Sequence, residues 1–376
     1  MPLRTLLSDL QQRLQGELFP WAEETVGPLT AKTQLFITVL EMAPVETALT
    51  VCPGLRGRPL SGRAPLARAF VAKSIHGIAT TVLLIDRLAH DKTLRQLCGW
   101  PRAGAVPGES TFSRAFAEFA ASALPSRVHE ALITATHKER LVGHVSRDAT
   151  AIEAREKPVK VKLAKRCRSK QRPEKGEPGY ETRRRLERQP AMTLEEMLRD
   201  LPTHCAVGMK PNAKGFKSAW TGYKLHIDTA DGDIPLTCLL TSASLHDSQA
   251  AIPLATMTAR RVTNLYDLMD ASYDAPEIIA ACRALGRVPI IPEQPRRTKG
   301  LKTGMTAEAA ARRRINFQTA ELIRYRERTS AERVNARLKD EFGGRSVRVR
   351  GHAKVMCHLM FGVLALTVDQ MMRLVT

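Results

Sequence analysis

The chain has 376 residues and 43% hydrophobic content, which suits an ordinary soluble protein with room for two or three domains. Its 58 Lys and Arg residues outnumber 38 Asp and Glu residues, and the net charge of +20 predicts a polyanionic partner, most simply nucleic acid. An anionic membrane surface is the competing partner. The absence of a basic amphipathic helix with bulky aromatic residues argues against it.

The cysteines and the apolar stretches limit the possible classes further. No CxxC pair occurs, which argues against a zinc knuckle, and the odd, dispersed set predicts reduced thiols in a cytoplasmic protein. The cysteines are Cys52, Cys98, Cys167, Cys205, Cys238, Cys282 and Cys357. Polar residues at 9–13 interrupt any signal-like apolar run. The apolar stretch 355–375 contains charged and amide residues, so it predicts a buried helix rather than a membrane span.

Residues 1–138 are predicted to form a helical N-terminal domain that binds DNA. Leucines recur at helical spacing over residues 3–14, and a stretch rich in Pro and Gly over 52–65 breaks the pattern. Residues 66–88 then predict one long apolar helix, which residues 93–100 continue after a break.

A possible DNA reader follows a Gly/Pro turn. Ser110 is the expected N-cap of a helix in which Phe112, Phe116 and Phe119 line one face. A short helix, a turn and this helix could form a helix-turn-helix, with Arg114 near the exposed start of the second helix. A plain core helix is the alternative.

The period changes to that of a strand over residues 141–152, with Asp148 near the C-terminal part. An isolated Asp in this position is usually a turn or capping residue. From about residue 155 to 217 the pattern dissolves into basic runs broken by prolines, with a short helix at 192–201. We interpret this stretch as a basic insertion that is flexible when free and lies along phosphates when DNA is bound; a solubilising loop is the alternative.

Two strands at 219–229 and 234–241 form an expected hairpin with its turn at Asp231–Gly232. A helix follows at about 248–260, with Asp247 as its expected N-cap; the alternative is that His246 and Asp247 approach the functional site. The next strand, at 265–270, ends on a second acid, Asp270, for which Asp267 and Asp274 are rivals. The remaining expected elements are a helix at 276–285, a strand at 288–291 and a second basic loop at 295–314.

A third acid lies on a helix further along the chain. Tyr325, Arg328, Glu332 and Lys339 fall at offsets of 0, 3, 7 and 14, which keeps them on one helical face. The opposite face carries apolar residues at 334, 338 and 342. One carboxylate among cations and a phenol indicates a metal ligand flanked by phosphate-binding groups. The alternative is a solvent-exposed helix with no binding function, in which Arg328 and Glu332 form a surface ion pair.

The spacing of Tyr325, Arg328, Glu332 and Lys339 resembles the YREK signature of one branch of the DDE transposases of bacterial insertion sequences. The residues around Asp148 and those around Asp270 resemble the stretches that carry the first two catalytic acids of these enzymes. The resemblance implies an α/β, RNase H-like mixed sheet flanked by helices over residues 139–376, with the basic insertion at about 155–217. Residues 94–100 and 110–112 resemble the family's all-helical N-terminal domain.

The same resemblance implies a function. Asp148, Asp270 and Glu332 would be catalytic and would hold two Mg²⁺ ions, with Mn²⁺ able to substitute. Tyr325 and the signature cations would contact phosphates. The partner would be double-stranded DNA, first as transposon ends carrying terminal inverted repeats and then as target DNA, bound by a homodimer in a bacterial, nucleoid-associated cytoplasmic setting. An RNase H-like metal-dependent nuclease and a catalytically inactive transposase-derived DNA-binding protein are the rivals.

Overall fold

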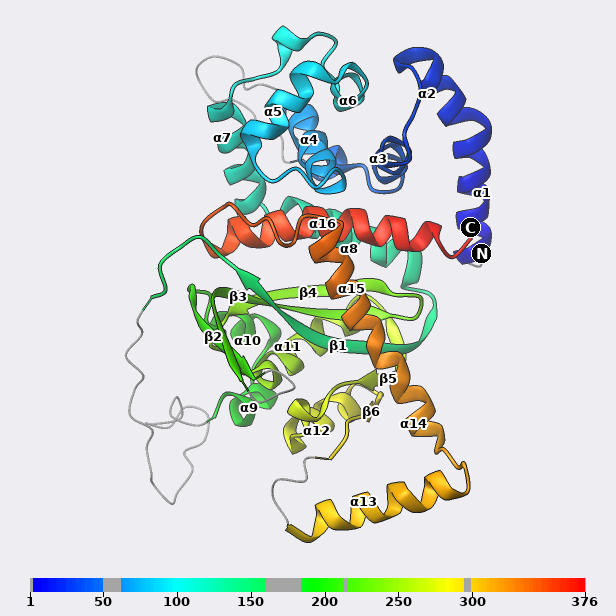
Figure 1. Ribbon diagram of the computed structural model, residues 1–376, viewed down its shortest axis with the longest axis vertical. Coiled ribbons are helices and arrows are strands. Elements are labelled where there is room, and N and C mark those ends of the chain that lie inside the picture. The colour runs from blue at the N-terminus through cyan, green and yellow to red at the C-terminus, as the bar shows by residue number, and fades with distance from the viewer. Residues whose placement is uncertain (1–2, 50–61, 160–183, 212–215, 294–298, 376) are drawn as a thin grey trace.

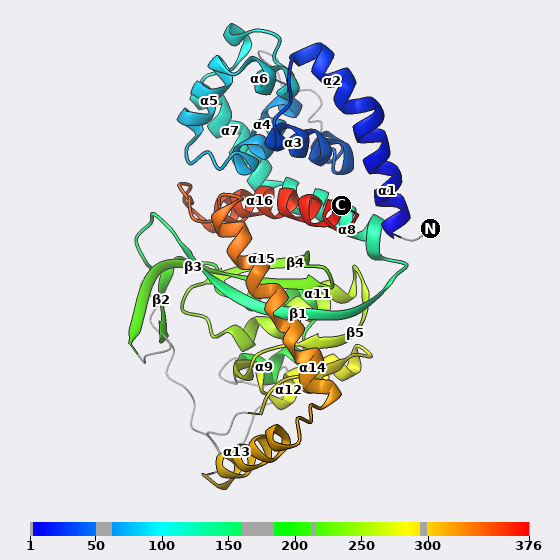
Figure 2. The same ribbon diagram turned by 45° about the vertical axis from the view of Figure 1, so that its right-hand side comes forward.

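The computed structural model describes residues 3–49, 62–159, 184–211, 216–293 and 299–375. Helices from the first third of the chain gather on one side of the long helix α16 (His352–Met372), and a twisted sheet lies on its other side (Figure 1). Helix α15 (Thr329–Asp340) crosses one face of that sheet, and the view turned by 45° shows the same arrangement (Figure 2).

The helices that precede the first strand are α1 (Leu3–Arg13), η1 (Leu14–Leu18), α2 (Phe19–Val26), α3 (Ala31–Met42), η2 (Val45–Ala48), α4 (Arg63–Ile75), α5 (Thr81–His90), α6 (Lys92–Cys98), η3 (Ala103–Ala105), α7 (Glu109–Ala121) and α8 (Leu124–His137). The single long helix predicted at 66–88 is wrong. Helix α4 ends before Gly77, whose φ of +64° favours glycine, and Thr80 then caps α5 by accepting a hydrogen bond from Leu83 N at 3.1 Å.

Helix α7 begins earlier than its sequence suggested. Gly108 is its N-cap, and Ser110 lies inside the first turn, so the predicted cap at Ser110 is wrong. The three phenylalanines predicted on one face are buried, as expected. Arg114 is exposed near the start of the helix, as a DNA-reading role requires, and that role stays a prediction.

Helix α16 joins the helical part to the sheet. It packs against α3, α4, α7 and α8, and also against the strand β4 (Ile234–Ser242). By length and composition α16 could cross a membrane, but most of its apolar stretch is buried inside the protein, as predicted for a core helix. The division of the chain into domains at residue 138 stays a prediction.

The sheet also contains β1 (Leu141–Glu153), β2 (Ala206–Pro211), β3 (Lys217–Ala230), β5 (Thr263–Leu268) and β6 (Val288–Ile290). Strands β1 and β3, and likewise β3 and β4, pair antiparallel, whereas β5 is parallel to both β1 and β6. The helices η6 (Asp247–Ala250), α11 (Ala251–Ala259), η7 (Ala271–Tyr273) and α12 (Pro276–Ala284) connect its later strands. This mixed sheet flanked by helices confirms the predicted α/β, RNase H-like fold.

Strand β2 was not predicted, because it lies within the irregular basic stretch. Gly222 on β3 pairs with both Glu153 of β1 and Ala206 of β2, so β3 carries β2 beyond the end of β1. A Cβ at Gly222 would lie 2.1 Å from Ile152 O, which makes glycine necessary at this junction. The described parts of the stretch also hold α9 (Arg185–Arg188), η5 (Gln189–Ala191) and the predicted short helix, α10 (Leu194–Asp200), while 160–183 lie outside the described residues.

The second basic loop was predicted wrongly, since most of it forms helix α13 (Lys299–Arg314). The signature residues follow on α14 (Ala320–Tyr325), η9 (Arg326–Arg328) and α15, so a 3₁₀ turn interrupts what was expected to be one helix. The opposite, apolar face is buried as predicted, with Val334 1% and Leu338 0% exposed.

Candidate active site

Strand β1 carries Asp148 on the face that α15 covers. Ser146 Oγ donates to Glu327 O at 3.0 Å, and Asn335 Nδ2 of α15 donates to Asp148 Oδ2 at 3.1 Å. Because strand side chains alternate between faces, Arg147 points to the other side of the sheet. Asp148 is therefore held between the sheet and the helix that bears Glu332.

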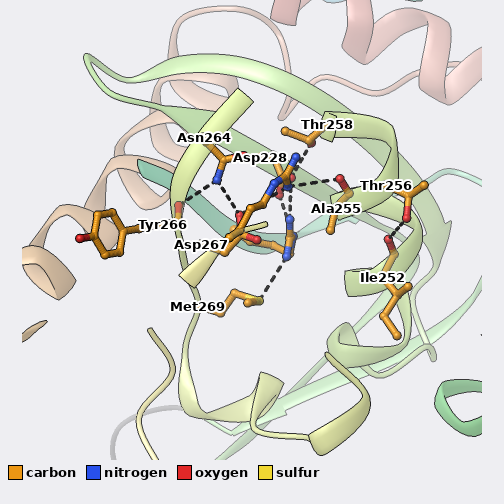
Figure 3. A network of polar contacts seen from close by, with 11 residues as sticks. Asp228, Ile252, Ala255, Thr256, Thr258, Asn264, Tyr266, Asp267 and Met269 are labelled. Atoms are coloured by element: carbon orange, nitrogen blue, oxygen red, sulfur yellow. Dashed lines mark hydrogen bonds and ion pairs between the residues drawn. The ribbon is translucent and has the colours of Figure 1, made fainter. Parts of the chain in front are cut away.

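Arg147 enters a buried polar network behind the sheet. Its Nε and Nη2 donate to Asp228 at 2.8 and 2.7 Å, and Thr258 Oγ1 donates to the same carboxylate at 2.6 Å (Figure 3). Arg147 is 1% and Asp228 0% exposed. The pair ties β1 to β3 directly beneath Asp148.

Asp267 belongs to this buried network and not to the candidate site. It accepts from Asn264 Nδ2 at 3.1 Å and lies 3.7 Å from Arg287 (Figure 3). Asp267 is 0% exposed, and the guanidinium of Arg287 compensates the charge of its carboxylate. Of the two rivals of Asp270, Asp267 is therefore excluded from the site, and Asp274 is not.

A cleft of about 610 Å³ opens between β1, β2, β3 and α15. It is lined by Asp148, Ala149, Thr150, Ala151, Met209, Lys210, Trp220, Lys224, His246, Asp247, Glu332, Asn335, Ala336 and Lys339. Two of the three predicted acids, Asp148 and Glu332, thus share one cleft with the predicted cation Lys339. The side chain of Glu332 is 51% exposed, and Arg328 Nη2 donates to it at 2.6 Å.

Asp270 lies near this cleft but does not line it. It is the N-cap of η7 and accepts from the backbone N of Ser272 at 2.8 Å and from the hydroxyl of the same residue. Its charge helps to raise the pKa of both Asp148 and Tyr325, which places it close to both. Over the described ranges no three His, Cys, Asp or Glu side chains are gathered tightly enough to hold a metal, so the three acids are not preassembled.

The environment of Asp148 suits a bound cation. Burial raises the pKa of its carboxyl to about 6, and Asp270 adds to the rise, although the Ala149 backbone amide, Lys210 and Arg328 act in the opposite direction. No described Lys or Arg forms an ion pair with it. Asp148 is a half-buried carboxylate that lacks a paired cation in the described structure and shares the cleft with Glu332. Carboxylate oxygens of this kind are the ligands that Mg²⁺ and Mn²⁺ prefer.

The raised pKa predicts that Asp148→Asn stabilises the metal-free protein. Because the folded pKa of about 6 exceeds the ordinary value of 3.8, the parent loses stability as pH rises from 4 to 6. The variant should therefore gain about 3 kcal/mol at pH 8 and less than about 1 kcal/mol at pH 4. Thermal unfolding at both pH values, in chelator, measures this. An equal gain at both pH values would contradict the assignment.

The other signature residues form a short polar chain beside the cleft. Arg328 lies over the ring of Tyr325, 5.8 Å from its centroid, and pairs with Glu332. Burial, followed by Arg345 and Lys210, lowers the pKa of Lys339, as expected for a cation held among cations in a partly buried position. The predicted DNA-binding residue Arg114 stands apart from this group, on α7 (Figure 1).

His246 and Asp247 both line the cleft, which agrees with the alternative interpretation of this pair. The favoured interpretation of Asp247 as a helix cap is wrong, because His246 is the cap and Asp247 pairs with Lys224 at 2.8 Å. Two further cleft residues were not predicted. Lys210 lies on the unpredicted strand β2. Asn335, three residues after Glu332, could have been found from helical spacing, since it falls on nearly the same face.

Comparison with known families agrees with this geometry. The family model described as a transposase DDE domain matches residues 148–368, more than half of the chain. The matched span begins at Asp148 and includes Asp270 and Glu332. Neither the search of curated proteins nor the search of solved structures gave a match.

Proposed function

The chain belongs to the transposase DDE domain family, and from this we propose that it binds the terminal inverted repeats of an insertion sequence and catalyses Mg²⁺-dependent DNA cleavage and strand transfer. The observation that carries the proposal is the cleft that Asp148 and Glu332 share with Lys210 and Lys339, with Arg328 paired to Glu332 beside it. Acids alone would repel DNA; acids flanked by cations admit a phosphate together with a metal ion.

The acids have distinct tasks in this proposal. Asp148 and Glu332 would hold the cation from opposite walls of the cleft, and Asp270 would join them by turning away from Ser272. Two bound Mg²⁺ ions, or Mn²⁺ in their place, would lower the pKa of an attacking water and stabilise the leaving 3′-oxygen. Phosphoryl transfer of this kind needs no protein nucleophile.

The cations bind and orient the DNA strand beside the acids. Arg328 can grip a phosphate with two parallel hydrogen bonds once it releases Glu332, whereas Lys210 and Lys339 act as point charges. The Tyr325 hydroxyl can donate to a further phosphate oxygen. Arg313 and Arg314 are exposed at the end of α13, a helix that lies beyond the sheet (Figure 1), and they add positive charge there.

Neutralising Arg328 and Lys339 together, as Arg328→Gln with Lys339→Gln, should weaken DNA binding and reduce its salt dependence. Each lost phosphate contact lowers the slope of log K against log salt by about 0.9. Fluorescence anisotropy with a labelled duplex across a salt series measures both effects. The control is Arg373→Gln, which removes an exposed cation already paired with Asp369. A slope equal to that of the parent would exclude phosphate contacts by the signature cations.

The function itself is tested with a DNA fragment that carries the gene and its own flanking sequence. In Mg²⁺ or Mn²⁺ we expect cuts at the flanks and products in which the freed 3′-ends are joined to target DNA, both suppressed by chelator. Cuts without joined products would indicate the nuclease alternative. Binding without any cut would indicate a DNA-binding relic. The sedimentation coefficient of the same protein–DNA complexes tests the proposed homodimer. We also propose that the protein is located in the cytoplasm, in association with the nucleoid.

A further inference from the structure

Asn335 is a buried amide on a helix whose neighbouring buried residues are mostly apolar. It is 6% exposed, and Ala331, Val334 and Leu338 beside it pack into the core. Burying an amide where an aliphatic side chain would fit is unfavourable unless its polar atoms are used. Asn335 also lines the cleft, one helical turn after Glu332.

One polar atom of the Asn335 amide has a hydrogen-bond partner, and the other has none among the described residues. Nδ2 donates to Asp148 Oδ2 at 3.1 Å, joining α15 to β1. An ionised carboxylate only accepts hydrogen bonds, so the amide nitrogen must be the end that faces it. The Oδ1 atom of Asn335 is buried, and no donor among the described residues reaches it.

A second Asn–Asp pair in the fold shows what is different at Asp148. Asn264 Nδ2 donates to Asp267 Oδ1 at 3.1 Å, and its own Oδ1 is likewise buried without a partner in the described structure (Figure 3). Asp267, however, already has Arg287 at 3.7 Å. At Asp148 the amide is the only described side chain that donates to the carboxylate, and no described Lys or Arg forms an ion pair with it; the carboxylate instead lines the cleft.

We propose that Asn335 is a further ligand of the divalent cation, an inference that rests on the function proposed above. Without metal, its Nδ2 holds the Asp148 carboxylate. With metal on Asp148, an N–H group beside the cation would be repulsive. The two ends of the planar amide are nearly equal in size, so a half turn needs no extra room and places Oδ1 on the ion. Asn335 thus adds a neutral oxygen ligand to the acids of the site.

The test measures Mn²⁺ binding to the full-length protein without DNA, by electron paramagnetic resonance of the free ion. Any Mn²⁺ binding that is lost in the variant Asp148→Asn is assigned to this site. Asn335→Leu should weaken that binding about ten- to hundredfold. Asn335→Asp should bind Mn²⁺ at least as tightly as the parent, because it keeps an oxygen ligand and adds charge. Asn264→Leu, which removes the matched amide outside the cleft, should leave Mn²⁺ affinity unchanged.

The two Asn335 variants separate a ligand from a residue that only holds Asp148. If Asn335→Asp loses affinity as severely as Asn335→Leu, the amide acts solely as a donor and the proposal is overturned. Parent-like affinity in Asn335→Leu, or no Mn²⁺ binding that depends on Asp148 in the parent, also overturns it. The proposed function can fail separately: Mn²⁺ binding with the expected pattern, but without joined DNA products, would retain the ligand and reject transposition.

Discussion

Replacing Glu332 with glutamine should lower the rate of DNA cleavage by at least about a thousandfold while leaving DNA affinity nearly unchanged. The substitution removes one charged oxygen ligand from the cleft. Metal-assisted stabilisation of a phosphoryl-transfer transition state contributes several kcal/mol, and about 4 kcal/mol corresponds to a thousandfold in rate. DNA affinity should persist because Arg328, released from its 2.6 Å pair with Glu332, remains available to phosphate.

Glu341, at the C-terminal end of α15, provides a matched control. Glu341 pairs with Arg337 at 2.7 Å in the same i,i+4 arrangement and is 48% exposed, close to the 51% of Glu332, but it does not line the cleft. Each exposed pair contributes only about 0.3–0.5 kcal/mol to stability, so both variants should fold normally. Equal cleavage by Glu332→Gln and Glu341→Gln, or equal loss of binding and cleavage in Glu332→Gln, would remove Glu332 from the proposed role.

Arg147→Met should lower the free energy of unfolding by about 3–5 kcal/mol, because it leaves the Asp228 carboxylate buried without its cation. Thr258 Oγ1 would still donate to Asp228, but one neutral hydroxyl cannot replace two charge-assisted bonds. Urea unfolding followed by circular dichroism measures the shift. Adding Asp228→Asn to Arg147→Met should recover part of the loss, since it removes the stranded charge.

The control for Arg147 is an arginine in an exposed pair. Arg13 binds Glu41 at 2.7 Å with 62% of its side chain exposed, so Arg13→Met should cost less than about 1 kcal/mol. If Arg147→Met shifts the unfolding midpoint no more than Arg13→Met, the buried pair does not stabilise the sheet beneath Asp148. Failure of Asp228→Asn to recover stability would show that lost packing, and not stranded charge, dominates.

The sequence predicted those parts of the fold in which local pattern and tertiary environment agree. Alternation over residues 141–152 predicts β1 because one face meets α15 and the other meets the buried network. The Asp231–Gly232 pair likewise predicts the β3–β4 hairpin, whose loop spans residues 231–233. The buried face of α15 follows from apolar spacing alone.

The parts that could not be predicted depend on partners distant in the chain. Strand β2 exists because β3 extends past β1 and offers it an edge, which the basic composition around residues 206–211 does not reveal. Likewise, the local sequence favours Asp247 as a helix cap, whereas its ion pair with Lys224 on β3 depends on the tertiary structure. The role of Asn335 depends on Asp148, 187 positions away, so helical spacing could locate the amide but not its contact.

The packing of α16 determines the order in which the protein can assemble during its synthesis. This helix follows every other described element in the chain, yet α3, α4, α7 and α8, which emerge from the ribosome long before it, pack against it. Until His352 and the residues after it have been translated, the early helices lack the surface that buries them. A chain interrupted before that point would expose apolar side chains that chaperones and proteases recognise, so translation of α16 and closure of the protein interior are coupled.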